Sequence, residues 1–317
     1  MVALINYMSQ ILVELVKLAN LIININKSIA CGNRIQSIFE MQPSITDGSG
    51  QKVDKVQTDT ADRSEEAEYA VEFSHVGLTY AGAGDESLTD IDFKVKKGET
   101  IGIIGGTGSG KSSVVNLIPR FYDVTSGFIK VDGKDVKDYP LEELRGKIGT
   151  VLQKAVLFHG TIRENLKWGN PDATEEDLNR AITVAQAKEF VDNKEGRLDF
   201  EIEQGGKNLS GGQRQRLTIA RAVVKKPEIL ILDDSASALD FATDAALRKA
   251  IREMEGETTV FIVSQRAASI QHADRIVVLD DGKIVGLGTS EELLESCEVY
   301  QEIYNSQFKK QEGGKTA

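Results

Sequence analysis

The hydrophobic pattern of the first 42 residues predicts one long helix. Apolar residues recur at alternating spacings of four and three, which places them on one helical stripe; they are Leu4, Met8, Ile11, Leu15, Leu18, Ile22 and Ile25. Glu14 and Lys17 interrupt the run, so it falls short of about 18 uncharged apolar residues. Two interpretations stay open: an amphipathic helix that packs on a partner or in a bundle, or a membrane helix whose polar side faces a wet cavity.

The pattern changes at Pro43, which we expect to end this helix. Residues 44–68 are rich in Ser, Thr, Asp, Gln and Lys, a composition typical of a solvated linker, so we assign 43–68 to a linker. From Tyr69 onward, short strand-like and helix-like runs alternate up to about residue 310, beginning with strands at 71–73 and 88–95. The polar tail over 311–317 is expected to be disordered.

Composition excludes several classes of function. The 317 residues are 40% hydrophobic and 27% charged, with a formal net charge of −11. That charge argues against a nucleic-acid partner, because nucleic-acid-binding proteins usually carry a basic face. Cys31 and Cys297 are the only cysteines and belong to no CxxC or Cys/His cluster, so we expect neither a disulfide framework nor a zinc site.

A glycine-rich loop follows a short apolar strand over 100–104. The loop and its continuation read Gly105, Gly106, Thr107, Gly108, Ser109, Gly110, Lys111, Ser112 and Ser113. We predict a helix over 111–121, which completes the strand–loop–helix context that a phosphate-binding loop requires. Glycines let the backbone wrap phosphates, and the free N–H groups attract the anion. Lys111 is then expected to reach the β- and γ-phosphates, and Ser112 to ligate Mg²⁺.

A second apolar run, Ile229 to Leu232, follows Pro227 and is typical of a strand buried on both faces. Asp233 stands at its end, where ligands of parallel sheets usually bind. A carboxylate there can hold Mg²⁺ through water. Taken alone this signal is weak, but with Lys111 and Ser112 upstream it predicts a magnesium–nucleotide site.

A third segment carries a family resemblance; it reads Leu209, Ser210, Gly211, Gly212 and Gln213. Together with the two motifs above, it makes residues 69–310 resemble the nucleotide-binding domain of an ABC transporter. The resemblance implies an α/β fold: a P-loop NTPase (RecA-like) core with an antiparallel β subdomain and an α-helical subdomain that holds this signature, all preceded by a long N-terminal helix. In the family, the signature binds the γ-phosphate held by the opposite subunit, so two domains clamp ATP between them.

The resemblance also assigns roles to single residues. It implies that Tyr80 stacks on adenine, that Gln153 contacts Mg²⁺ and senses the membrane domain, and that Asp240 belongs to the D-loop. The cofactors implied are ATP and Mg²⁺. Residues 1–42 look like the last transmembrane helix of an exporter with its cytoplasmic extension, so helices one to five would be missing from this chain. The location implied is the cell membrane, with the ATP-binding domain on the cytoplasmic side.

Two positions depart from the family pattern. The residue after Asp233 is usually Glu, the general base, but here it is Asp234, whose carboxylate is one methylene shorter. The switch histidine is replaced by Gln265, which can donate a hydrogen bond but cannot carry a charge. We therefore expect Lys111, Gln153, Asp234 and Gln265 to form a site that binds ATP well and hydrolyses it slowly.

These departures favour a heterodimer over a homodimer. The second ABC half-transporter would supply a competent catalytic site, and this chain's signature would complete it. The other implied partners are membrane-domain helices and a transported small molecule, which the sequence does not identify. Two alternatives stay open, namely a stand-alone importer-type ATPase subunit and a non-transport ABC ATPase.

Overall fold

The computed structural model describes residues 1–41, 43–48, 68–254 and 256–312. It separates into two compact units, Met1–Thr46 and Asp47–Ala317, which are described separately. The first unit consists of helix α1 (Val2–Phe39). By length and composition alone, α1 is long and apolar enough to cross a membrane. The predicted helix over 1–42 is thus confirmed, although α1 ends at Phe39, three residues earlier than predicted.

The second unit is built on a six-stranded sheet with the order β12-β11-β3-β10-β9-β6. Its strands are β3 (Thr100–Gly105), β6 (Ile148–Val151), β9 (Ile229–Asp233), β10 (Thr259–Val263), β11 (Arg275–Asp280) and β12 (Lys283–Gly288). All neighbours pair in parallel except β12, which is antiparallel to β11. Every residue of β9 is buried, as the continuous apolar run predicts for a strand flanked on both sides and covered on both faces.

An antiparallel sheet adjoins this core, with the order β2-β1-β4-β5. Its strands are β1 (Tyr69–Leu78), β2 (Leu88–Lys96), β4 (Ser126–Val131) and β5 (Lys134–Asp135). Alternate residues of β2 are buried, and its apolar residues join those of β3 in one hydrophobic cluster. In chain order, α3 (Lys111–Leu117) lies between β3 and β4, and α4 (Leu141–Lys147) lies between β5 and β6.

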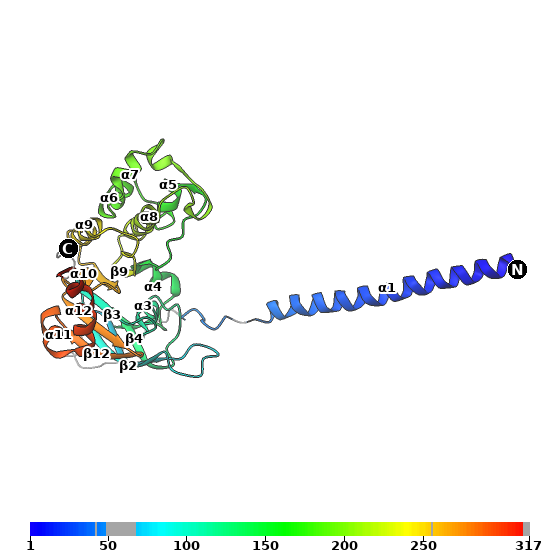
Figure 1. Ribbon diagram of the computed structural model, residues 1–317, viewed down its shortest axis with the longest axis horizontal. Helices are drawn as coiled ribbons and strands as arrows, with labels where there is room; N and C mark the ends of the chain where they lie inside the picture. Colours follow the sequence, from blue (N-terminus) through cyan, green and yellow to red (C-terminus); the bar gives the residue numbers. More distant parts are fainter. Residues whose placement is uncertain (42, 49–67, 255, 313–317) are drawn as a thin grey trace. The chain divides into compact units, whose positions relative to one another are not determined.

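A mainly helical subdomain is inserted between β6 and β9, with its helices gathered together (Figure 1), and it shares a second hydrophobic cluster with residues of these two strands. Its elements are β7 (Gly160–Thr161), α5 (Ile162–Lys167), α6 (Glu175–Val184), α7 (Lys188–Asp192), the 3₁₀ turns η1 (Arg197–Asp199) and η2 (Gln204–Gly206), β8 (Glu201–Ile202) and α8 (Gly211–Val223). The predicted fold class, a parallel α/β core with an antiparallel subdomain and a helical subdomain, is confirmed.

The remaining helices complete the core. They are α9 (Phe241–Arg252), α10 (Ala267–Ile270), α11 (Ser290–Ser296) and α12 (Glu298–Glu312). Residues of α10, α11 and α12 pack with β3 and β11 in a third hydrophobic cluster, in which the Tyr300 ring is completely buried. This cluster fixes α12 against the sheet.

The predicted helix over 111–121 is wrong at its end, because α3 stops at Leu117. Two residues explain the early end. Pro119 has no N–H to donate to the carbonyl four residues earlier, and Arg120 has a φ of +51°, in the left-handed region. The Arg120 guanidinium nitrogen Nε then donates to Asp123 Oδ1 at 2.7 Å, which holds the chain as it leaves the helix.

The linker and tail also differ from prediction at their edges. Asp47 Oδ1 accepts a hydrogen bond from the Leu141 backbone N–H at 2.7 Å. The predicted linker is therefore attached to the folded unit at Asp47, near its N-terminal end. Residues 49–67 of that linker lie outside the described residues. At the other end, α12 continues to Glu312, and 313–317 of the predicted tail also lie outside the described residues.

Candidate functional site

The motif residues from β3, β9 and β10 meet in one cleft. These parallel neighbours end at the same edge of the sheet, where open α/β folds bind their ligands. The cleft has a volume of about 590 Å³. Predicted site residues that line it are Tyr80, Thr107, Gly108, Gly110, Lys111, Ser112, Ser113, Gln153, Asp233, Asp234 and Gln265. Gly105, Gly106 and Ser109 belong to the same loop but are not on the cleft wall.

The glycine-rich loop uses backbone conformations that other residues rarely adopt. Gly108 and Gly110 have φ angles of +85° and +92°, in the left-handed region that glycine enters without strain. A Cβ on Gly110 would also lie 2.6 Å from Leu88 Cδ2. The Gly110 carbonyl accepts from Val114 N–H at 3.0 Å and so opens α3. The sequence pattern thus encodes a turn that leads directly from strand to helix.

Lys111 folds back over this loop. Its ammonium donates to the carbonyl oxygens of Gly105 at 3.0 Å and Gly106 at 2.6 Å, and to Ser109 Oγ at 3.4 Å. Burial lowers the pKa of Lys111, while the charges of Asp234 and Asp233 act in the opposite direction. The cation is thus held at the loop by weak, neutral acceptors, which phosphate oxygens can replace with stronger charge-assisted bonds.

Ser112 and Asp233 bring two side-chain oxygens next to each other. Ser112 Oγ donates to Asp233 Oδ1 at 3.0 Å. Burial raises the pKa of Asp233, and the neighbouring Asp234 adds to this, whereas the Ser112 hydrogen bond and Lys111 oppose it. Magnesium in nucleotide sites is usually held by one or two protein oxygens with phosphates and waters, which fits this pair. When bound, the ion would neutralise phosphate charge; among the described residues, no cluster of three acidic, His or Cys side chains could hold a metal alone.

Asp234 lies at a strained turn directly after β9. Its φ is +46°, and its N–H donates to the Val263 carbonyl at 2.9 Å, which joins the ends of β9 and β10. Gln153 Nε2 reaches Asp234 Oδ2 at 3.4 Å. Gln265 lines the same cleft two residues beyond β10. The structure thus brings together the residues predicted to act on water near the terminal phosphate.

The signature residues lie outside this cleft. Ser210 is exposed and precedes α8, where its Oγ accepts from Gln213 N–H at 3.2 Å and Gln213 Oε1 accepts from Ser210 N–H at 3.0 Å. This reciprocal capping box leaves other first-turn N–H groups of α8, a 13-residue helix, without intrahelical acceptors. Gly212 approaches the Ala238 carbonyl so closely that a Cβ would lie 3.0 Å from it. Leu209 is buried beneath.

Asp240 has a local structural role that the sequence did not reveal. Its carboxylate accepts from the Thr243 N–H at 2.9 Å and from Thr243 Oγ1 at 2.8 Å, and so caps α9. The backbone hydrogen bond from Thr243 is the main reason that the pKa of Asp240 is lowered. Within the described residues, the cleft and the exposed start of α8 therefore lie at separate places.

Comparison with known proteins agrees with this arrangement. The sequence model of the ABC transporter family matches residues 88–237. The chain carries an ABC transporter ATP-binding domain. This domain binds ATP and has the P-loop ATPase fold of its family. The assignments of single site residues rest on their positions in the motifs and on the geometry above.

Relatives match most of this chain. An uncharacterized ABC transporter ATP-binding protein, YfiB of Bacillus subtilis strain 168, is 40% identical over 307 residues, which are 97% of this chain and 51% of YfiB. A putative multidrug export ATP-binding/permease protein of the same strain, YgaD, is 36% identical over 97% of this chain and 51% of its own length. The chain thus spans about half the length of these relatives.

A solved structure also resembles the chain. It is that of a bacterial Atm1-family ABC exporter with ATP bound, with a TM-score of 0.79 and 29% sequence identity. The match covers 89% of this chain and 48% of that one. The likeness includes the ATP-binding domain and confirms its fold.

Tyr80 offers a specific test of the adenine end of the cleft. Its hydroxyl pairs with Ser113 Oγ at 2.8 Å, and its ring meets Tyr122 edge-on at 4.9 Å. We expect Tyr80→Ala to weaken ATP binding by about 5- to 150-fold, because base–aromatic stacking contributes about 1–3 kcal/mol. Tyr80→Phe removes only the hydroxyl and should retain the affinity in a calorimetric titration. Equal losses in both variants would contradict stacking.

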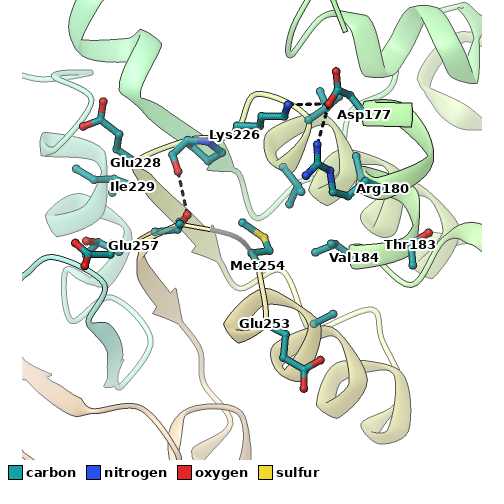
Figure 2. A pocket seen from close by; sticks show the side chains of 18 of the residues that line it. Asp177, Arg180, Thr183, Val184, Lys226, Glu228, Ile229, Glu253, Met254 and Glu257 are labelled. Carbon is teal, nitrogen blue, oxygen red and sulfur yellow. Dashed lines mark hydrogen bonds and ion pairs between the residues drawn. The ribbon is translucent and has the colours of Figure 1, made fainter. Parts of the chain in front are cut away.

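A larger cavity, of about 800 Å³, lies at the opposite ends of the strands, beside Ile229 and Thr259 (Figure 2). Figure 2 shows Lys226 and Arg180 both directed at Asp177. Lys226 Nζ lies 2.7 Å from Asp177 Oδ1, and Arg180 Nη2 lies 3.0 Å from the same oxygen. Among the described residues that line this cavity, there is no glycine-rich phosphate loop. We therefore assign the nucleotide to the smaller cleft.

Proposed function

We propose that this chain is the ATP-binding component of an exporter-type half-transporter that works in a pair. Two such domains would face each other, each holding ATP in its cleft and closing the opposite cleft with its signature. The observation that carries the proposal is that the Lys111 loop and Ser210 lie at separate places on one chain. Because Ser210 is exposed and does not line the cleft, a second copy or partner is needed to place a signature on the bound triphosphate.

The catalytic side of the cleft supports a slow site. Lys111, Ser112 and Asp233 line the cleft together, which supports binding of ATP and Mg²⁺ there. The side chain of Asp234 is one methylene shorter than that of a glutamate. The side chain of Gln265 is neutral, so it has no positive charge that could interact with the γ-phosphate. The proposal is therefore a heterodimer in which this chain's own site binds ATP firmly and turns it over slowly, while its signature serves the competent site of a second half-transporter.

The proposal places the chain at a membrane, and two observations support this location. The apolar length of α1 and the multidrug export name of YgaD support a transmembrane helix that joins a membrane domain on its partner chains. The ATP-binding domain would then lie on the cytoplasmic side. Closure and separation of the paired domains would drive a small molecule across the membrane, and hydrolysis would reset the pair.

The signature assignment can be tested with Ser210→Arg. In dimers of the chain that also carries Asp234→Glu and Gln265→His, we expect ATP turnover to fall by at least about 100-fold, because the new side chain blocks an anion site made of N–H groups. The affinity of this chain's own cleft for ATP, measured by calorimetry, should stay within about twofold.

Thr289→Arg is the matched control for that variant. Thr289 is also exposed and also forms a capping box, with Glu292, at the start of α11. Loss of either cap should lower stability by about 1 kcal/mol, but only the change at Ser210 should stop turnover. Turnover unaffected by Ser210→Arg would refute the shared site.

A further inference from the structure

The loop that carries Gln265 is fixed from three directions. The N–H of Ser264 donates to the Ile103 carbonyl at 3.1 Å, which ties the loop to β3. Arg266 extends the other way, and its guanidinium donates to the carbonyls of Ser237 at 3.2 Å and Leu239 at 3.5 Å. These contacts fix the residues before and after Gln265. The carbonyl of Gln265 itself is held from a third side, by α12.

Gln307 makes that third contact with both ends of its side-chain amide. Its Nε2 donates to the Gln265 carbonyl at 2.7 Å, and its Oε1 accepts from the Ala267 N–H at 2.9 Å. A carbonyl only accepts and a backbone N–H only donates, so the two partners fix the orientation of the amide. Ala267 begins α10, and its N–H has no acceptor within that helix. One side chain thus satisfies two backbone groups on either side of Arg266.

The helix that carries Gln307 is itself firmly anchored. Tyr300 is fully buried, and its hydroxyl pairs with Ser290 Oγ at 2.8 Å. Tyr304 stacks on Phe308 with ring centroids 4.2 Å apart. Gln307 lies seven residues after Tyr300, two helical turns along, and therefore on the same face of α12. The face that packs α12 onto the sheet also presents the amide to the loop.

We propose that Gln307 is a positioning residue for ATP hydrolysis, which acts by fixing the backbone of Gln265 at the edge of the cleft. This inference rests on the proposed role of Gln265 at the γ-phosphate. A side chain acting on a reacting group must be held to within about half an ångström, and the nearest restraint on its peptide is the Gln307 amide. The C-terminal helix thereby becomes part of the support of the active site.

The variants separate a positioning role from general packing. Gln307→Ala removes both hydrogen bonds. Gln307→Glu keeps the size and the acceptor for Ala267 but turns an oxygen toward the Gln265 carbonyl, so it should harm the site at least as much. Gln301→Ala is the matched control. Gln301 is half-buried on the same helix, and its amide donates to the Leu294 carbonyl at 2.8 Å, away from the cleft.

Turnover is best measured in the full chain that also carries Asp234→Glu and Gln265→His, where the proposed function predicts a measurable rate. In this background we expect either Gln307 change to lower kcat by about 10- to 100-fold, as a misplaced group does. The KM for ATP should stay within about twofold, because the phosphate loop is untouched. Gln301→Ala should change neither constant, although it should lower thermal stability to a similar extent.

Hydrogen exchange of the Ala267 amide gives a second readout in the wild-type chain. Exchange should be at least about tenfold faster in Gln307→Ala and unchanged in Gln301→Ala, because only the first removes the acceptor. Unchanged exchange, or faster exchange without a fall in kcat, would overturn the inference. If the double background gains no turnover at all, the proposed cause of the slow site fails instead, and the inference is then decided by exchange together with the basal turnover of the wild-type chain.

Discussion

Lys111→Ala is expected to abolish high-affinity ATP binding. The ammonium now rests on the Gly105 and Gly106 carbonyls, in reach of the site where the loop would hold the phosphates. When ATP binds, Lys111 exchanges these neutral acceptors for charged phosphate oxygens, and the stronger hydrogen bonds contribute to the binding free energy. Hydrogen bonds to charged groups contribute about 1.5–3 kcal/mol each, so loss of two should raise the dissociation constant by at least about 100-fold in a calorimetric titration.

Lys249→Ala is the matched control for that experiment. Lys249 lies on α9, with a side chain that is 77% exposed and only a 3.9 Å ion pair to Glu253. The same loss of one positive charge there should leave ATP affinity unchanged. If Lys111→Ala keeps its affinity, the triphosphate does not bind at this loop, and the assignment of the cleft is refuted.

The double change Asp234→Glu with Gln265→His is expected to raise hydrolysis by about 100-fold or more in dimers of the chain. A misplaced general base costs roughly 10²–10⁴-fold in rate, and the longer carboxylate and the imidazole restore the two groups that the site lacks. Both positions line the cleft beside Gln153 and Lys111. Steady-state phosphate release measures the gain, and adding Lys111→Ala should remove it.

Asp192→Glu with Gln271→His makes the same two chemical changes away from the cleft, on α7 and just after α10. This control should leave phosphate release unchanged. If the double change within the cleft gives no more release than the control, the slow site has another cause. The heterodimer proposal would then lose its main support from this chain.

The sequence predicted the parts of the site that are encoded within a few neighbouring residues. The glycine loop and the apolar run before Asp233 each depend on local backbone preferences. Accordingly, β3, α3 and β9 begin where expected. The end of α3 was missed because Pro119 and the left-handed Arg120 were given too little weight against the helical pattern.

Contacts between distant residues could not be predicted in the same way. Gln307 reaches Gln265 across 42 positions, and the hydroxyl of Tyr80 meets Ser113 across 33. Nothing in the local pattern around Gln307 distinguishes it from Gln301 on the same helix. The role of Asp240 in capping α9 had a local signal, since Thr243 follows three residues later, but the D-loop interpretation concealed it.

A structure of the paired protein with Mg²⁺ and a non-hydrolysable ATP analogue tests the shared site most directly. We expect the triphosphate to lie on the Lys111 loop of one chain, with a signature serine of the facing chain within hydrogen-bonding distance of its terminal phosphate, about 2.5–3.0 Å between oxygens. In a pair of identical chains that serine is Ser210. A nucleotide bound at the Lys111 loop while Ser210 faces only solvent would contradict the account.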